Sequence, residues 1–264
     1  MELAAERAKR WWQTRPPVRT IQRAAAFVDD VGLALLFPAR GVELPSLYNA
    51  ASERLADNLW TVEWGPEAER VWQWKDELPL GGRAWYGKFL GGRASLLSPA
   101  LLADLYPRSG RPDDFTKAPL GEDARRIAEV VLLSGPTSTA ALREELGLDG
   151  KKGQARFSRA LAELGRHLVV TNFGVEDHGP GWPAAVLELT ARAFAVPSSG
   201  RPGERRLAAA RTFLQTTLSC RDADVARAFA WTRRDARAQL EDLVARDEAT
   251  SEDGLYRPAR RRRR

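Results

Sequence analysis

The sequence predicts a mainly helical protein with small β-hairpins, built from tandem winged helix-turn-helix units. Residues 122–196 contain three helical patterns followed by two short strand patterns, and residues 201–257 repeat that order. Residues 20–64 show a less regular version of it. The strand-like segments are short and lie next to turn residues, so they can form wings but no extensive sheet.

The composition is that of a soluble globular protein. The 264 residues are 44% hydrophobic and 29% charged, enough for two domains or three small ones. The longest apolar stretch, residues 33–37, is far too short to cross a membrane, and the N-terminus has no apolar region typical of a signal peptide. One cysteine and two histidines exclude a disulfide scaffold and a Cys/His zinc site. We therefore expect a cytoplasmic protein without a metal or other cofactor.

The formal net charge of +6 arises at the C-terminal end. Residues 1–200 contain 25 basic and 25 acidic side chains, whereas residues 201–264 contain 16 and 10. A basic excess is typical of nucleic-acid-binding proteins, but here much of it comes from Arg260–Arg264, a run that has nothing to bury. Any evidence for nucleic acid must therefore come from the positions of the charges.

Residues 1–66 are expected to contain an N-terminal helix and a degenerate winged helix. A Pro16-Pro17 breaker ends the first helix, and Thr20 and Gly32 are the expected ends of the next. A short helix follows Pro45, and the alternation of residues 59–64 is typical of a strand.

Residues 67–121 are expected to form a tryptophan-rich connector that ends in a linker. Glycine pairs at 81–82 and 91–92 should divide it into short helices, and residues 108–121 have the composition of an exposed linker. Tryptophans in and before the connector could stack on unpaired bases, although such a cluster more often forms a core. These tryptophans are at positions 60, 64, 72, 74 and 85.

Residues 122–196 give the clearest winged helix. Phe157, Leu161, Leu164 and Leu168 form one apolar stripe along its third helix. The expected elements are helices over 124–133, from Thr137 or Ser138 to Leu146, and over 154–168, followed by strands over 169–173 and 184–189.

Residues 201–257 are expected to form a C-terminal winged helix. Thr232 and Asp235 resemble a capping box at the start of its third helix, and Gly254 suits the turn of a small wing. The first two helices are expected over 203–218 and 222–230, and the wing over 250–256. Residues 258–264 form a basic tail, which either adds phosphate contacts or is a flexible solubilising segment.

The third helix of such a unit normally enters the major groove of DNA. In both regular units, cations lie near its N-terminus on the face opposite the apolar stripe, where the helix dipole also favours anions. The expected DNA contacts are Lys151, Lys152, Arg156 and Arg159 in the central unit and Arg233, Arg234 and Arg237 in the last unit. The alternative is a solvated helix face, because Glu163, Glu241 and Asp242 share these surfaces.

The sequence lacks the catalytic motifs of common hydrolases. The Gly150–Gly153 turn fails as a phosphate loop because no Ser or Thr follows its lysines. His167 suits a helix C-terminus, where it interacts with the dipole, and His178 lies in the expected wing. Near the front apolar run the acidic residues are Asp29, Asp30 and Glu43, which we interpret as exposed charges.

Two segments carry a family resemblance. Val31–Pro38, followed by Arg40, Leu44 and Leu47, resembles the start of the AlkZ-type DNA glycosylases. Residues 74–79 (Trp-Lys-Asp-Glu-Leu-Pro) and 83–88 (Arg-Ala-Trp-Tyr-Gly-Lys) look like the AlkZ-related branch of that group. The resemblance implies tandem winged helices that bind DNA carrying alkylated or crosslinked bases.

The sequence departs from that family at the catalytic motif. In the glycosylases this stretch reads Gly-Leu-x-Gln-x-Gln/Asp-Pro, and the two polar residues position and activate the attacking water. Leu35 and Phe37 stand at the matching positions, and neither can accept a proton or orient a water. The resemblance therefore implies the DNA-binding scaffold without its usual hydrolytic machinery.

We therefore expect a duplex DNA-binding protein, cytoplasmic and associated with the nucleoid, that recognises damaged or distorted DNA without catalysing a reaction. One alternative is an active glycosylase whose catalytic carboxylate has moved to Asp29, Asp30 or Glu43. Another is a winged-helix module that binds a protein, since residues 1–200 carry no net charge.

Overall fold

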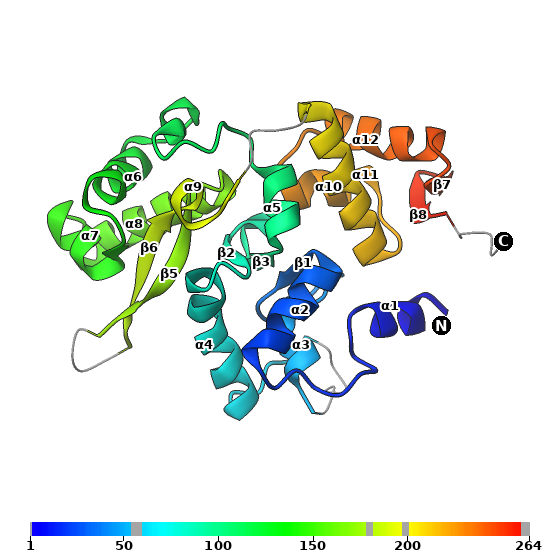
Figure 1. Ribbon diagram of the computed structural model, residues 1–264, viewed down its shortest axis with the longest axis horizontal. Helices are drawn as coiled ribbons and strands as arrows, with labels where there is room; N and C mark the ends of the chain where they lie inside the picture. Colours follow the sequence, from blue (N-terminus) through cyan, green and yellow to red (C-terminus); the bar gives the residue numbers. More distant parts are fainter. Residues whose placement is uncertain (1, 54–59, 178–181, 197–200, 260–264) are drawn as a thin grey trace.

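The computed structural model describes residues 2–53, 60–177, 182–196 and 201–259; His178 and Arg260–Arg264 lie outside the described residues. It is mainly helical with small antiparallel sheets, which confirms the expected fold class (Figure 1). Within these ranges, no helix combines the length and the apolar character needed to cross a membrane.

The first unit occupies the centre of Figure 1 and contains α2 (Ile21–Val31), β1 (Leu33–Leu35), α3 (Leu47–Ala51), α4 (Pro66–Leu80), β2 (Trp85–Lys88) and β3 (Ala94–Leu97). Thr20 caps α2 by accepting a hydrogen bond from the Arg23 N–H, and Gly32 ends it at φ 77°, as expected. The sheet has the strand order β1-β3-β2, so Leu97 lies opposite both Leu33 and Trp85. These elements form a three-helix unit closed by a small sheet.

Two expectations for this region are wrong. Residues 60–64 form no strand: the Tyr48 hydroxyl binds the backbone N–H and C=O of Glu63 at 3.0 and 3.2 Å, where a ladder partner would be needed. Residues 66–97 are not short helices but one 15-residue helix and a hairpin, because Val71, Trp74 and Leu78 form a buried stripe that continues through Pro79. Residue 66, the expected end of the first domain, lies at the start of α4, and the domain boundaries expected at residues 66 and 121 remain predictions.

The second unit repeats this order with α6 (Glu122–Ser134), β4 (Thr137–Ser138), α7 (Thr139–Glu145), α8 (Gly150–Arg166), β5 (Val170–Glu176) and β6 (Ala184–Leu189). Its sheet order is β4-β6-β5. Ser138 caps α7 by accepting from the Ala141 N–H, and Phe157 and Leu164 of α8 are buried, as the pattern predicts. The short α9 (Thr190–Ala193) follows the wing.

The third unit contains α10 (Pro202–Thr217), α11 (Asp222–Phe229), α12 (Arg233–Ala245), β7 (Ala249–Glu252) and β8 (Leu255–Pro258). Thr232 caps α12 through the Asp235 N–H, and Gly254 forms the turn at φ 71°. In place of the first strand of the other units, this unit has a single backbone β-bridge between Cys220 and Tyr256. The unit boundaries expected at 122–196 and 201–257 remain predictions.

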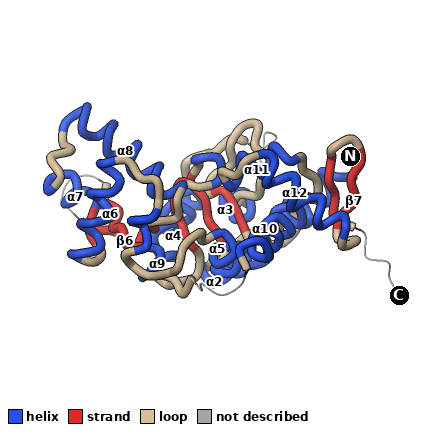
Figure 2. The backbone as a smooth tube through the Cα atoms, turned by 90° about the horizontal axis from the view of Figure 1, so that it is seen from above, coloured by secondary structure: helices blue, strands red, loops and turns tan. Residues whose placement is uncertain are grey.

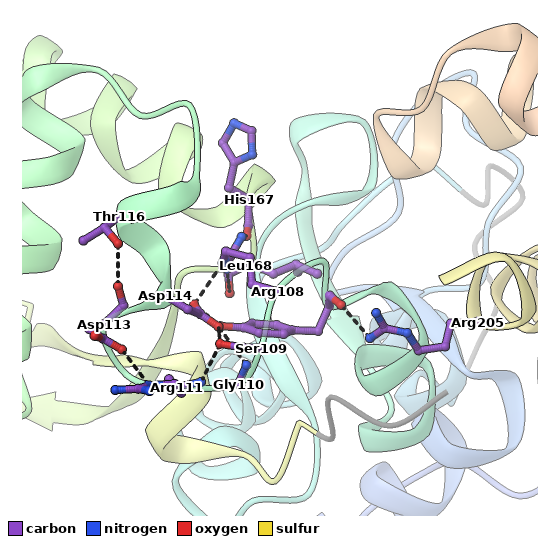
Figure 3. Close-up of polar contacts among 11 residues, drawn as sticks. Arg108, Ser109, Gly110, Arg111, Asp113, Asp114, Thr116, His167, Leu168 and Arg205 are labelled. Carbon is purple, nitrogen blue, oxygen red and sulfur yellow. Dashed lines mark hydrogen bonds and ion pairs between the residues drawn. The ribbon is translucent and has the colours of Figure 1, made fainter. Parts of the chain in front are cut away.

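The segment expected as an exposed linker is an anchored junction (Figure 3). It lies between α5 (Pro99–Leu105) and α6 and includes the turn η2 (Asp114–Lys117). The buried Asp114 accepts from the Tyr106 hydroxyl at 2.9 Å and from Arg108 Nε at 3.0 Å, and Arg108 also donates to the His167 carbonyl at 2.8 Å. The charged side chains of Asp114 and Arg108 can be buried because each forms hydrogen bonds with the other and with neighbouring groups. The composition of the segment does not reveal this pairing.

Shared cores hold the units together. One apolar cluster joins Leu33, Leu35 and Trp85 of the first unit to Phe213 and Leu240 of the third. Helix α1 (Glu2–Arg10) and the residue after it add polar links. Arg7 Nε and Trp11 Nε1 donate to the third-unit carbonyls of Thr217 and Thr216, both at 2.8 Å, and Arg10 lies 3.1 Å from Asp30 of the first unit. The same apolar cluster contains Leu168 and Phe194 of the second unit, so the three units are fixed relative to one another.

Candidate nucleic-acid interface

The helices that carry the seven expected cations, α8 and α12, are linked through η1 (Leu90–Gly92), the turn between β2 and β3. The turn contacts both α8 and α11, and α12 packs against α11. In Figure 2, α8 and α11 lie along one edge of the molecule, opposite α9, α5 and α2. We call the surface of α8, η1, α11 and α12 the α8–α12 edge.

Two glycines permit the close approach of these elements. A Cβ on Gly165 of α8 would lie 2.9 Å from the Lys88 carbonyl oxygen, so α8 rests directly on the end of β2. Gly91 adopts φ 58°, and a Cβ there would lie 3.1 Å from a guanidinium nitrogen of Arg93 and 3.8 Å from the side chain of Arg227 on α11. Gly165 therefore sets the spacing between α8 and β2, whereas Gly91 supplies the left-handed backbone conformation of the turn.

On α8, three of the four expected cations lack a carboxylate partner among the described residues. These three, Lys151, Lys152 and Arg159, are exposed. Arg156 instead forms a two-point ion pair with Asp123 of α6, at 2.9 and 2.6 Å. The Arg156 hydrogen bonds hold the pKa of Asp123 below its usual range, so this arginine is already neutralised.

On α12, one carboxylate neutralises two of the three expected cations. Arg233 and Arg237 donate to the Asp222 carboxylate at the start of α11, at 2.9 and 2.7 Å. Burial alone would raise the pKa of Asp222, but the hydrogen bonds from both arginines lower it overall. Arg234 is exposed and has no carboxylate partner within the part of the chain that the structure describes.

A cavity of about 500 Å³ opens beside η1, between residues 40–44 and α11. Its lining includes the side chains of three arginines, two carboxylates and several apolar residues, among them Arg40, Arg93, Arg227, Glu43, Asp224, Leu90 and Phe213. None of these three arginines forms an ion pair with a described residue. Sequence reasoning missed them as site residues, because they come from a loop, a hairpin and the second helix of a unit, which no helical periodicity connects.

The carboxylates considered for a relocated catalytic role have structural contacts or lie exposed. Asp30 accepts from Trp12 Nε1 at 2.6 Å and lies 3.1 Å from Arg10, which fixes the segment after α1. Asp29 is exposed on α2. Glu43 lines the arginine cavity, where Arg7 Nη1 donates to it at 2.5 Å.

Leu35 and Phe37, which the resemblance places at the glycosylase motif, have apolar surroundings as well as apolar side chains. Leu35 is 1% exposed in the core shared with the third unit. Phe37 is half-buried against Tyr48 and Trp72, with ring centroids 5.7 and 6.4 Å away. Neither position holds a polar group that could act on water.

The chain belongs to the AlkZ-related family, because the model of that family matches residues 18–228. Among solved structures it is similar to the DNA glycosylase AlkZ of Streptomyces sahachiroi, with a TM-score of 0.54 and 14% identity. That match covers 94% of this chain and 66% of the solved one, so this chain spans just under two thirds of AlkZ. No curated protein matches the chain. At this identity the structural likeness shows the shared winged-helix fold.

Proposed function

We propose that this protein binds double-stranded DNA along the α8–α12 edge and recognises damaged or distorted duplexes without excising a base. It would then act at the nucleoid, in the cytoplasm. The observation that carries the proposal is the joining of α8 to α11 and α12 through η1, which holds the helices that carry the unpaired cations close to one turn of the first unit.

The charges on this edge suit a phosphate backbone. Lys151, Lys152, Arg159 and Arg234 are exposed cations without carboxylate partners among the described residues, and each that meets a phosphate releases condensed counterions. The arginines of the neighbouring cavity add further cations beside η1, in a lining that they share with Glu43 and Asp224. Arg156, Arg233 and Arg237, which the sequence also indicates, would contribute only if the duplex displaced Asp123 or Asp222.

The direct test is duplex affinity in two double variants that remove equal charge. Lys152→Ala with Arg234→Ala removes two cations of the proposed edge, and we expect affinity to fall about tenfold at low salt. Arg19→Ala with Arg23→Ala removes two exposed cations beside and on α2, of which Arg19 is paired with Glu53, and should change affinity little because α2 lies opposite α8 and α11 in Figure 2. Equal losses in both double variants would contradict the assignment of the edge.

A second candidate function is a DNA glycosylase that uses Glu43. The observation that favours it is the position of this carboxylate in the lining of the arginine cavity. Incubation with a duplex carrying alkylated purines, followed by heating in alkali, would reveal excision as strand breaks. Breaks that disappear in Glu43→Gln would support the glycosylase; binding without breaks supports the noncatalytic function.

A further inference from the structure

A cluster of exposed tryptophans lies outside the α8–α12 edge. Trp64, Trp72 and Trp182 are 55%, 36% and 75% exposed, and their ring centroids are 6.2–6.3 Å apart in every pair. Trp64 lies in the segment before α4, Trp72 lies in α4, and Trp182 lies just before β6 of the second unit. By contrast, Trp74 and Trp85, which the sequence grouped with Trp64 and Trp72, are buried in the core.

A cavity of about 510 Å³ adjoins this cluster between α4 and β5. Trp72 and Trp182 contribute aromatic lining, and Lys75 and Asp76 contribute a charged pair that is 6% and 7% exposed. Lys75 Nζ donates to Asp76 Oδ2 at 2.6 Å, and Asn172 Nδ2 donates to Asp76 Oδ1 at 2.8 Å. The cavity therefore combines exposed π-surfaces with buried polar groups that are held in place.

We propose that this cavity binds an unpaired nucleobase, stacked on Trp182 with its polar edge toward Lys75 and Asp76. A nucleobase has both a π-face for the indole and hydrogen-bonding groups along its edge. The Lys75 ammonium has three N–H donors, and Asp76 is its one hydrogen-bonding partner among the described residues, so a base carbonyl or ring nitrogen can accept another. An apolar peptide side chain would cover the indoles but leave these buried charges without new partners.

The site lies within the scaffold that supports the proposed DNA surface. Strand β2 contacts α4 and β5, which form the cavity, and also contacts α8 of the α8–α12 edge. A strand that leaves a distorted duplex at this edge would therefore meet the cavity on neighbouring elements. The inference rests on the proposed function, because it needs DNA to deliver the base.

The test compares three duplexes of one sequence: fully paired, with a single unpaired purine, and with an abasic analogue at that unpaired position. Stacking on one indole should make the protein bind the purine bulge at least about fivefold more tightly than the abasic bulge. Trp182→Ala should abolish this difference and leave affinity for the paired duplex unchanged, whereas Trp182→Phe should retain part of it. Leu133→Ala, at an 85% exposed apolar residue of α6, is the matched control.

The outcomes separate the two proposals. Binding of the paired duplex without discrimination between the bulges would overturn the nucleobase site, leave the DNA proposal intact and point to a protein partner for the tryptophans. Equal losses for all three duplexes in Trp182→Ala would also overturn it, because Trp182 would then be an ordinary part of the duplex surface. Failure to bind the paired duplex would contradict the proposed function itself.

Discussion

Asp222 sets the number of cations that α12 can present. Its carboxylate forms ion pairs with Arg233 and Arg237, whose side chains are exposed while paired. We expect Asp222→Asn to raise duplex affinity and to increase the salt dependence by about one counterion, because one negative charge is removed and the arginines become free to meet phosphates. Fluorescence anisotropy at several salt concentrations measures both quantities. Unchanged or weaker binding would show that this part of α12 does not face DNA.

Ion pairs between a carboxylate and an arginine also make the free energy of unfolding depend on pH in the acidic range. The pKa values of Asp123, Asp222 and Glu248 are all lowered, Asp123 and Glu248 chiefly by hydrogen bonds from Arg156 and Arg211. A carboxyl group with a lowered folded-state pKa stabilises the fold above its unfolded-state pKa, and that stabilisation is lost as the pH falls through the folded-state value. Urea unfolding at pH 7 and pH 3 should therefore show a smaller loss of stability in Asp222→Asn than in the wild type. An identical loss would contradict the role of this ion pair.

Sequence reasoning found the cations of α8 and α12 but not their partners. The apolar stripe of a helix identifies its opposite face, so the exposure of Lys151, Lys152 and Arg234 could be predicted. Asp123 precedes Arg156 by 33 residues, and only the packing of α6 against α8 brings them together. Neutralisation of a cation by another element is a tertiary property that a single helix pattern does not contain.

At the scale of elements, the segment between α5 and α6 has a specific structural role. The side chain of Asp114 is 3% exposed beside Arg108, which binds the end of α8. Asp114→Ala leaves a buried guanidinium without its counter-charge, and we expect a loss of about 3–5 kcal/mol in the free energy of unfolding. Asp113→Ala, which removes an exposed partner of Arg111, should cost less than about 1 kcal/mol. Equal urea midpoints for the two variants would contradict this account of the junction.

The contact of α8 with β2 can be tested at one glycine. Alanine normally stabilises a helix relative to glycine by about 0.5–1 kcal/mol, as we expect for Gly203→Ala in α10, where no atom lies within 4 Å of the added Cβ. At Gly165 the added Cβ would meet the backbone of Lys88 at 2.9–3.3 Å, so we expect Gly165→Ala to destabilise the protein. Thermal unfolding of both variants measures the difference. A gain in stability at Gly165 would mean that α8 is not held tightly against β2.

Local signals predicted most elements, and the failures have local reasons. The caps at Thr20, Ser138 and Thr232 fixed helix starts because their side chains bind backbone N–H groups that the helix leaves free. The alternation of residues 59–64 predicted a strand, but no strand in the described part of the chain pairs with residues 60–64, and the Tyr48 hydroxyl binds the Glu63 backbone instead. A strand needs a partner, which periodicity alone does not supply.

At the scale of the whole molecule, the proposed function depends on how the units are joined. The sequence predicts winged units in series but not their relative orientation. That orientation follows from the core shared by the first and third units and from η1, which touches both α8 and α11. The arginine cavity exists only in this arrangement, because its lining comes from both of those units. The cations of separate units can serve one duplex only if this docking brings them to one side.

The most direct measurement of this central claim is the salt dependence of duplex affinity in the wild type and in a variant with alanine at four positions, Lys151, Lys152, Arg159 and Arg234. Each phosphate contact contributes about 0.9 to the slope of log K against log salt. We expect a clearly negative slope for the wild type, which becomes shallower by about three to four in the variant. A wild-type slope near zero would remove DNA as the partner, and an unchanged slope in the variant would show that DNA binds elsewhere.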